Sequence, residues 1–456
     1  MAVPILAMTK MFDKACRTLV VGLGETGLSV ARYLSRQGVA VAIVDSRDNP
    51  PGLEKLRAEL PADVALFLGG FHEEAFMRAE QIVISPGVSA SEPEIAAAVA
   101  RGVPLIGDIE LFAQAVNAPV LAVTGSNGKS TVVTLLSAMA RCAGKEVRTG
   151  GNIGTPALDL IKDTEPDLYV LELSSFQLET VESLQPQAAV VLNVSADHMD
   201  RYSDMASYAA AKQAVYRHAG IQVVNADDPL AAGLADTTRA QLRFTEQLPG
   251  ENEYGLVESA GETWLARGTE KLMPVSRIRM AGRHNVMNAL AALALGESAG
   301  LPLVAMLETL SEFQGLPHRM QHVVMHDDVQ WYNDSKGTNV GATLAAIDGV
   351  EGRVVLIAGG DGKGADFTPL ANAMQDKGRA AVLIGKDAAV LGALLAEVVP
   401  VSYALDMVEA VTLAAGLARP GDCVLLSPAC ASTDMYRNFV ERGEVFINAV
   451  HQVLES

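Results

Sequence analysis

The chain has 456 residues, of which 49% are hydrophobic and 20% are charged, and its formal net charge is −19. This length predicts about three packed domains, and the composition excludes a disordered or low-complexity protein. The negative charge opposes binding to DNA, RNA and anionic membranes, so we expect an enzyme with no nucleic-acid or membrane partner, in which local clusters of donors bind any phosphate.

The first predicted block begins with a β–α–β unit over residues 18–45. Its first strand ends in Gly22-Leu23-Gly24-Glu25-Thr26-Gly27, which fits the dinucleotide-binding fingerprint, and Asp45 lies where an acid would bind a ribose. The same spacing suits any diphosphate at a helix N-terminus, or only a tight turn. We favour a nucleotide-sugar diphosphate, with a nicotinamide or flavin cofactor and a structural turn as the alternatives.

Two further strands, at 81–84 and 101–106, complete this block. The first ends in the turn Ser85-Pro86-Gly87, and a helix that begins at Gly107 leads into a new α/β pattern. This restart predicts a domain boundary near residue 107.

The motif Gly-Ser-Asn-Gly-Lys-Ser-Thr at 125–131 predicts a phosphate-binding loop between a buried strand and a helix. Its glycines let backbone N–H groups point inward, Lys129 supplies a positive charge, and its serine or threonine supplies a hydroxyl for Mg²⁺. The general P-loop pattern has a further glycine where this chain has Val123. Binding of a nucleoside triphosphate is our first prediction; the alternative is an ordinary strand–turn–helix with a chance lysine.

Two strand ends in the second block carry polar groups that are expected to face this loop. A strand at 169–173 carries Glu172, and a strand at 188–194 runs into His198. Because ligands bind at the carboxyl ends of parallel strands, the pair suits Mg²⁺ that bridges nucleotide oxygens. Taken alone, Glu172 reads as a solvated loop carboxylate and His198 as a hydrogen-bonded core histidine. Their joint position after a phosphate loop favours the metal site.

The rest of the second block gives weaker signals. Lys212 lies in a helical run, where a lysine is most often a solvated surface residue. Residues 245–280 read as small antiparallel strands packed on the main sheet. Asn285 and Asn288 open an alanine-rich helix, where they equally suit helix caps.

A third α/β block begins near residue 313, and no sequence repeat links the three blocks. It has four predicted strands, at 329–332, 354–358, 381–385 and 423–426, with polar turns after them. The glycine-rich turn after the second of these strands brings Lys363 close to any ligand that it cradles. The pattern is typical of a mononucleotide-binding half-fold.

Four cysteines are scattered without a CxxC pair, and the chain opens without the pattern of a cleavable leader. No apolar run reaches the roughly 18 residues that a membrane helix needs. These features predict a reduced, soluble protein of the cytoplasm.

Six polar motifs follow one another along nearly the whole chain. They are Thr-Gly-Ser-Asn-Gly-Lys-Ser-Thr at 124–131, Glu-Leu-Ser-Ser-Phe-Gln-Leu-Glu at 172–179, Asp-His-Met-Asp-Arg-Tyr at 197–202, Gly-Leu-Pro-His-Arg at 315–319, Asn-Asp-Ser-Lys at 333–336 and Leu-Ser-Pro-Ala-Cys-Ala-Ser at 426–432. In this order they resemble the motifs of the Mur ligases. Within that family the resemblance is greatest to the members that add D-glutamate to UDP-N-acetylmuramoyl-L-alanine.

The resemblance implies an α/β protein of three domains. Residues 1–107 would form a Rossmann-like UDP-binding domain, residues 108–313 a central P-loop ATPase-like domain, and residues 314–456 a Rossmann-like amino-acid-binding domain. It also implies ATP as co-substrate, two Mg²⁺ ions, an acyl-phosphate intermediate, and release of ADP and phosphate. The enzyme would act as a cytoplasmic monomer in the synthesis of peptidoglycan precursors.

The resemblance also assigns roles to residues. The catalytic residues would be Lys129, His198 and Lys212, and Mg²⁺ would bind Ser130, Glu172, His198 and, once carbamylated, Lys212. ATP would contact Gly125, Ser126, Asn127, Gly128, Lys129, Ser130, Thr131, Asn285, Arg319 and Asp334. The UDP-sugar would contact Gly24, Thr26, Asp45, Ser46, Arg47, Ser85, Gly87, Asn152 and Gln177. D-Glutamate would contact Lys336, Thr338, Lys363, Ser432 and Phe439.

One departure from the family pattern is Gly337, which stands where alanine is often found and is expected to loosen the loop around Thr338. Several other functions stay open at this point. A sister Mur ligase or a folylpolyglutamate synthase would share the ATPase core. A nicotinamide oxidoreductase would leave Lys129 and Lys363 without a role, and a non-catalytic nucleotide-gated scaffold would bind ATP without amino-acid-dependent hydrolysis.

Overall fold

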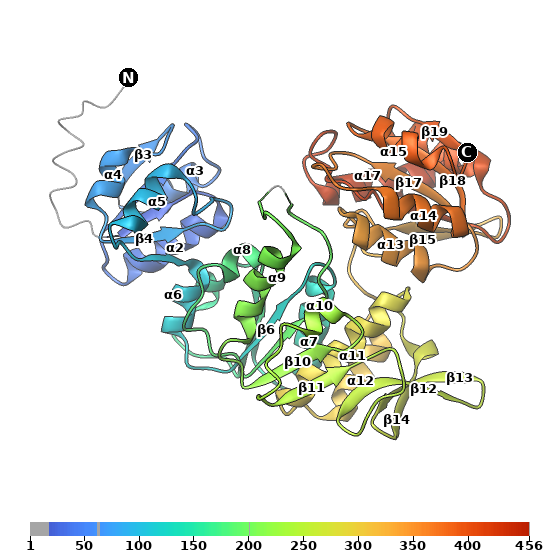
Figure 1. Cartoon of the computed structure of the whole chain (residues 1–456), viewed down its shortest axis with the longest axis horizontal. Coiled ribbons are helices and arrows are strands. Elements are labelled where there is room, and N and C mark those ends of the chain that lie inside the picture. Colours follow the sequence, from blue (N-terminus) through green and yellow to red (C-terminus); the bar gives the residue numbers. More distant parts are fainter. Residues whose placement is uncertain (1–17, 62–63, 200, 456) are drawn as a thin grey trace.

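The computed structural model describes residues 18–61, 64–199 and 201–455. Figure 1 shows three α/β bodies, in which the blue N-terminal body and the orange C-terminal body lie on opposite sides above the green and yellow central body. Each body has its own sheet, and all three sheets are rich in parallel pairs. The predicted three-part α/β architecture is confirmed, and the limits at 107 and 313 stay predictions.

The N-terminal sheet is parallel, in the order β3-β2-β1-β4-β5. Its strands β1 and β2 are buried along their whole length, as their β-branched, apolar sequences favour. The order of connection reverses between β1 and β4, and such a switch point opens a crevice at the carboxyl ends of the strands. Its elements are β1 (Thr18–Val21), α2 (Glu25–Arg36), β2 (Val41–Asp45), α3 (Leu53–Glu59), β3 (Ala65–Leu68), α4 (Glu73–Arg78), β4 (Gln81–Ile84), α5 (Pro93–Ala100) and β5 (Leu105–Gly107).

The central sheet has nine strands in the order β14-β13-β12-β11-β10-β9-β6-β8-β7. Its strands are β6 (Val120–Thr124), β7 (Val147–Gly151), β8 (Leu168–Glu172), β9 (Ala188–Val191), β10 (Ile221–Asn225), β11 (Gln241–Phe244), β12 (Glu253–Ser259), β13 (Glu262–Arg267) and β14 (Glu270–Pro274). The prediction of small antiparallel strands over 245–280 is confirmed, but their predicted packing on the main sheet was wrong. Strand β12 pairs in parallel with β11, so the antiparallel hairpins extend the sheet at its edge.

Helices cover both faces of the central sheet. On one face α7 (Lys129–Cys142), α11 (Arg283–Ser298) and α12 (Leu303–Glu312) share an apolar core. On the other face, α6 (Asp108–Ala115) and the short helix at Ala157–Leu160 share one core with α2 of the N-terminal body. The remaining helices are α8 (Ser175–Leu178), α9 (Met205–Gln213) and α10 (Pro229–Ala232), with further 3₁₀ turns at Ala214–Tyr216 and Val275–Arg277.

The C-terminal sheet has six strands in the order β15-β16-β20-β17-β18-β19, and only β15 runs antiparallel to its neighbour. The prediction of four strands missed β15 and β19, which lie at the two edges of the sheet and are partly exposed. The elements are β15 (Gln321–His326), β16 (Val329–Asn333), α13 (Val340–Gly349), β17 (Val354–Gly359), α14 (Thr368–Lys377), β18 (Gly378–Ile384), α15 (Ala388–Leu395), β19 (Val401–Tyr403), α16 (Met407–Leu417), β20 (Cys423–Leu426) and α17 (Phe439–Leu454).

Among the described helices, none combines the length and apolar character needed to cross a membrane. Cys142, Cys423 and Cys430 are free thiols, and Cys16 lies outside the described residues.

Candidate active site

The phosphate-binding loop lies between β6 and α7, and its glycine at 128 packs closely against a neighbouring helix. A Cβ at Gly128 would lie 2.4 Å from Asn288 Oδ1, and Gly128 has a φ of +87°, which favours glycine. Gly128 is also the N-cap of α7 and makes no side-chain cap hydrogen bond. The first N–H groups of α7 therefore suit an anionic ligand.

Lys129 is the first residue of α7 and folds back over the loop. Its Nζ donates to Gly125 O at 2.7 Å and to Ser126 O at 2.9 Å. Burial lowers the pKa of Lys129, while the nearby Glu172 carboxylate opposes that shift. A phosphate that enters the loop would offer this ammonium stronger acceptors than the two carbonyl oxygens.

A cavity of about 740 Å³ opens beside the loop and brings together most of the predicted catalytic groups. Glu172 ends β8 and is only 3% exposed. Its Oε1 accepts from Asn152 Nδ2 at 2.8 Å, and its buried Oε2 has no hydrogen-bond partner among the described residues. A buried carboxylate oxygen without a partner is costly, so this position suits a cation. The predicted metal-binding residues Ser130, Glu172, His198 and Lys212 all line this cavity.

The donor set at this cavity fits Mg²⁺ that is shared with phosphate oxygens. In the described part of the chain, no three His, Cys, Asp or Glu side chains gather as a site that would hold a metal alone. Mg²⁺ typically binds one or two carboxylates and completes its shell with substrate phosphates and water. Ser130 Oγ, which accepts from Arg319 Nη2 at 2.8 Å, would have to exchange that hydrogen bond for the ion.

Lys212 is not the surface residue that its helical sequence suggests. It is 1% exposed, its Nζ donates to Gly125 O at 3.1 Å, and it lies 4.2 Å from the centre of the Tyr208 ring. Burial, and then the charge of Lys129, hold the pKa of Lys212 well below its usual value. A neutral lysine amine is a nucleophile, so the site suits the carbamylation that the family resemblance implies.

His198 lies on the loop after β9, in a left-handed backbone conformation with φ of 57°. Its backbone N–H donates to Asp197 Oδ1 at 3.0 Å, and its ring contacts Phe176 with centroids 4.8 Å apart. These contacts direct the imidazole into the same cavity as Glu172.

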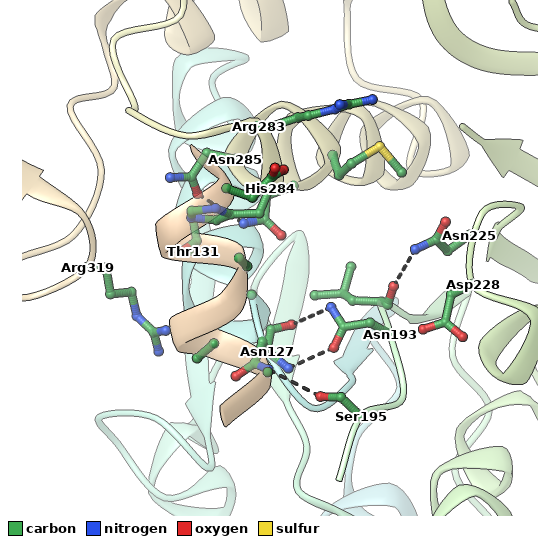
Figure 2. A pocket seen from close by; sticks show the side chains of 18 of the residues that line it. Asn127, Thr131, Asn193, Ser195, Asn225, Asp228, Arg283, His284, Asn285 and Arg319 are labelled. Atoms are coloured by element: carbon green, nitrogen blue, oxygen red, sulfur yellow. Dashed lines mark hydrogen bonds between the residues drawn. The ribbon is translucent and has the colours of Figure 1, made fainter. Parts of the chain in front are cut away.

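A second cavity, of about 430 Å³, lies on the other side of the phosphate loop (Figure 2). Thr131, Asn285, Arg319 and Asp334, all predicted ATP contacts, line it. Burial raises the pKa of Asp334 to about 7, although Ser427 Oγ donates to it at 2.7 Å. Asn127 and Arg319 line both this cavity and the 740 Å³ cavity, so a bound triphosphate can extend from one into the other.

Sequence reasoning missed several side chains of this second cavity. Asn193 follows β9 and Asn225 is the last residue of β10, so the rule that ligands bind at strand ends would have found them. In Figure 2 the side chain of Asn193 pairs with the backbone of Asn127, with its Oδ1 accepting from Asn127 N at 2.8 Å. Asn285 and Asn288 are not helix caps, because the N-cap of α11 is Gly282.

A third cavity, of about 580 Å³, lies at the switch point of the N-terminal sheet. The structure brings all nine predicted UDP-sugar contacts to its wall, namely Gly24, Thr26, Asp45, Ser46, Arg47, Ser85, Gly87, Asn152 and Gln177. The helix there packs closely on the turn, since a Cβ at Gly27 would lie 1.8 Å from Gly22 O. Asn152 lines this cavity and the 740 Å³ cavity, and so connects them.

Asp45 lines the third cavity, and Asp108 contacts Gln177, another residue of its wall. Asp45 Oδ2 accepts from Leu23 N at 2.7 Å, and the Arg47 guanidinium donates to both of its oxygens. Burial opposes the charge of Asp45, but these hydrogen bonds outweigh burial and lower its pKa. Asp108 accepts from Gln177 Nε2 at 3.0 Å, and burial raises the pKa of Asp108 to about 6.

The predicted amino-acid contacts are only partly brought together. Lys336, Thr338 and Lys363 line the 740 Å³ cavity, whereas Ser432 and Phe439 do not. Phe439 is nevertheless close, because Lys336 Nζ lies 4.1 Å from the centre of its ring. Burial, and then the Arg319 charge, lower the pKa of Lys336 to about 8.

The expectation that Gly337 loosens its loop was wrong. Its N–H donates to Asp334 O at 2.8 Å, and its carbonyl accepts from Ala429 N at 2.9 Å. A Cβ there would lie 2.5 Å from both Asp334 Oδ2 and Ser427 Oγ. The glycine therefore permits close packing at this point.

Family models match most of the chain. Residues 16–107 match "Mur ligase MurD-like, N-terminal domain", residues 123–296 match "Mur ligase middle domain", and residues 318–430 match "Mur ligase, glutamate ligase domain". The UDP-N-acetylmuramoylalanine–D-glutamate ligase of Nitrosococcus oceani is 56% identical over 96% of this chain and 97% of its own length. The ligase of the same name from Pseudomonas aeruginosa is 50% identical over 95% of this chain and 98% of its own length.

Solved structures show the same fold at lower identity. A MurF ligase from Thermotoga maritima in complex with ADP gives a TM-score of 0.60 at 16% identity, and the match covers 98% of this chain and 99% of that one. A UDP-N-acetylmuramate–alanine ligase from the same organism gives 0.59 at 19% identity, over 96% of this chain and 99% of that one.

Proposed function

The chain belongs to the Mur ligase family, and on that premise we propose that it joins D-glutamate to UDP-N-acetylmuramoyl-L-alanine while ATP is cleaved to ADP and phosphate. One observation carries this proposal. The cavity that Lys129 and Glu172 line adjoins two others, because it shares Asn127 and Arg319 with the 430 Å³ cavity and Asn152 with the 580 Å³ cavity. Each cavity contains residues suited to one substrate: the UDP-sugar, the nucleotide or an amino acid with two carboxylates.

In the first step, a carboxylate oxygen of UDP-N-acetylmuramoyl-L-alanine attacks the γ-phosphorus of ATP, and ADP leaves. A carboxylate needs this activation because oxide is too poor a leaving group. Phosphoryl transfer requires in-line positioning and compensation of negative charge. Lys129 and the first N–H groups of α7 would bind the phosphates, while Asn152 and Gln177 would orient the UDP-sugar.

In the second step, the amine of D-glutamate attacks the acyl carbon, a C–N bond forms, and phosphate leaves with one former carboxylate oxygen. The ammonium of Lys336 and that of Lys363 are suited to the carboxylates of D-glutamate, because both line the cavity that contains Glu172. The incoming amine loses a proton as the C–N bond forms.

We propose that Ser130, Glu172, His198 and carbamylated Lys212 hold two Mg²⁺ ions. When bound, these ions neutralise phosphate charge and polarise the transferring phosphoryl group. Addition of CO₂ to the neutral Lys212 amine forms a carbamate and releases a proton. The carbamate gives this buried position a negative charge. The unpartnered Oε2 of Glu172 and the low pKa of Lys212 support this assignment.

We also propose that the enzyme works in the cytoplasm as a monomer in the synthesis of peptidoglycan precursors. ATP as co-substrate supports the location, and one chain supplies the walls of all three cavities, which supports the monomer.

The test is a substrate panel with purified protein, ATP, Mg²⁺ and UDP-N-acetylmuramoyl-L-alanine. Phosphate release is measured with D-glutamate, L-glutamate, L-alanine and diaminopimelate in parallel. We expect release with D-glutamate well above that with the others. Equal release with L-alanine or diaminopimelate would indicate a sister ligase, and release that no amino acid stimulates would contradict the proposal.

A further inference from the structure

We infer that Asn339 is a positioning residue that couples the phosphate-binding loop to the amino-acid-binding domain, an inference that rests on the proposed function. Asn339 follows the proposed D-glutamate contacts Lys336 and Thr338 and is the N-cap of α13. Its Oδ1 accepts from Ala342 N at 2.8 Å. The cap fixes the orientation of the side chain and leaves its amide N–H groups available for other contacts.

Those N–H groups reach across to the central domain. Asn339 Nδ2 donates to Asp197 Oδ2 at 3.1 Å and to Asn127 Oδ1 at 3.3 Å. In return, Asn127 Nδ2 donates to Asn339 Oδ1 at 3.4 Å. One side chain of the C-terminal domain therefore contacts both the phosphate-binding loop and the loop that carries His198.

Both partners of Asn339 are held in place by further hydrogen bonds. Asn127 N donates to Asn193 Oδ1 at 2.8 Å, and Asn193 Nδ2 donates to Asn127 O at 3.1 Å, as the dashed lines in Figure 2 show. Asp197 Oδ1 accepts from His198 N at 3.0 Å. The two residues that Asn339 contacts therefore each have a further hydrogen bond within the central domain.

The start of α13 also packs directly on the central domain. A Cβ at Gly341 would lie 2.9 Å from Ser195 Oγ, so this turn of helix has no space for a side chain. Asn339 itself is only 9% exposed. In this arrangement a shift of the central loops would move the residues just before α13, which include Thr338 and Lys336.

Asparagine is suited to this role because it is both a donor and an acceptor. Aspartate would cap α13 equally well but would place a second carboxylate beside Asp197. We expect the ligand in the phosphate-binding loop and the D-glutamate near Lys336 to be aligned through this contact. Misalignment of two reactants by about 1 Å can cost roughly a hundredfold in rate.

The test compares wild type with Asn339→Asp, which keeps the helix cap and removes the contact. We expect kcat/KM for D-glutamate to fall by roughly tenfold to a hundredfold, and KM for the UDP-sugar to stay within about twofold because its cavity lies on the other two domains. The double variant Asn339→Asp with Asp197→Asn reverses the donor and the acceptor, so we expect it to recover most of the lost kcat/KM.

Asp406→Asn is the matched control, because Asp406 caps α16 of the same domain by accepting from Glu409 N at 2.9 Å. We expect this control to keep wild-type kinetics. Three results would overturn the inference: unchanged kinetics of Asn339→Asp, an equal loss for all three substrates, or a double variant no better than Asn339→Asp. A wild type that forms no product from D-glutamate would instead refute the proposed function.

Discussion

The two junctions between domains are built differently. At the N-terminal junction, Leu28 of α2 and Leu158 of the central domain belong to one apolar core, and Arg201 Nη1 donates to Pro86 O at 2.7 Å. At the C-terminal junction, the two cores of the last domain contain none of the described residues of the central domain. The described hydrogen bonds of Arg319 and Asn339 to Ser130, Asn127 and Asp197 cross that boundary instead.

This difference suggests which domain moves. Shared apolar burial contributes about 25 cal/mol per Å² and is lost when the parts separate, whereas a typical hydrogen bond contributes only about 0.5–1.5 kcal/mol net, because water can replace it. The first two domains therefore stay together around the UDP-sugar cavity, whereas the third domain supplies Arg319 and Asp334 to the nucleotide cavity. The third domain can exchange its polar contacts for ligand contacts, and so is suited to bring D-glutamate to the acyl phosphate.

The largest effect on activity is expected from a change in the phosphate-binding loop, which lies away from the junction of the first two domains. Lys129→Ala removes the ammonium that would bind the outer phosphates, so we expect ADP formation to fall by roughly a thousandfold. The fold should remain, because the lost contacts are to carbonyls of its own loop. Coupled ADP release and thermal unfolding measure the two effects, with exposed Lys145→Ala as the control. Normal turnover in Lys129→Ala would refute the role of the loop.

A smaller effect should follow from weakening the N-terminal junction. Arg201 connects Pro86, in the turn that lines the UDP-sugar cavity, to Glu179 and stacks on the Phe176 ring at 4.1 Å. We expect Arg201→Ala to raise KM for the UDP-sugar by roughly tenfold and to leave KM for D-glutamate within about twofold. An increase in KM for D-glutamate alone would contradict the claim that the N-terminal junction supports binding of the UDP-sugar.

The contrast can be sharpened by measuring domain distances directly. One pair of labels would measure the distance between the N-terminal and central domains. A second pair would measure the distance between the central and C-terminal domains. On addition of a non-hydrolysable ATP analogue and Mg²⁺, we expect the second distance to change and the first to stay constant. Equal changes in both distances would show that the junctions do not differ in rigidity.

The smallest effect concerns Asp108 at the N-terminal junction. Because burial raises the pKa of Asp108 to about 6, the folded state binds more protons than the unfolded state between pH 4 and 6, and stability falls as pH rises. Asp108→Asn removes this penalty. We expect the free energy of unfolding of the variant, measured with denaturant, to rise relative to that of wild type by about 1–3 kcal/mol between pH 4 and pH 8. A difference that is constant with pH would contradict the assignment.

Part of the site follows from sequence because its residues come in a motif at a strand end. The phosphate loop was predicted on that basis, whereas the UDP-sugar contacts were implied by the family resemblance, and the structure gathers both sets at cavities. Asn339 carries no such signal, and only the packing of its domain against the central domain brings it to the phosphate loop. The burial of Lys212 could not be predicted from the sequence either, because it depends on Tyr208 and Gly125, which cover one position of an otherwise ordinary helix.

The central claim is that ATP activates the carboxylate of the UDP-sugar as an acyl phosphate, and an oxygen label tests it most directly. UDP-N-acetylmuramoyl-L-alanine labelled with ¹⁸O in its carboxylate is turned over with unlabelled ATP and D-glutamate, and the released phosphate is analysed by mass spectrometry. The account predicts one ¹⁸O atom in each phosphate molecule. Unlabelled phosphate, together with normal peptide product, would contradict it.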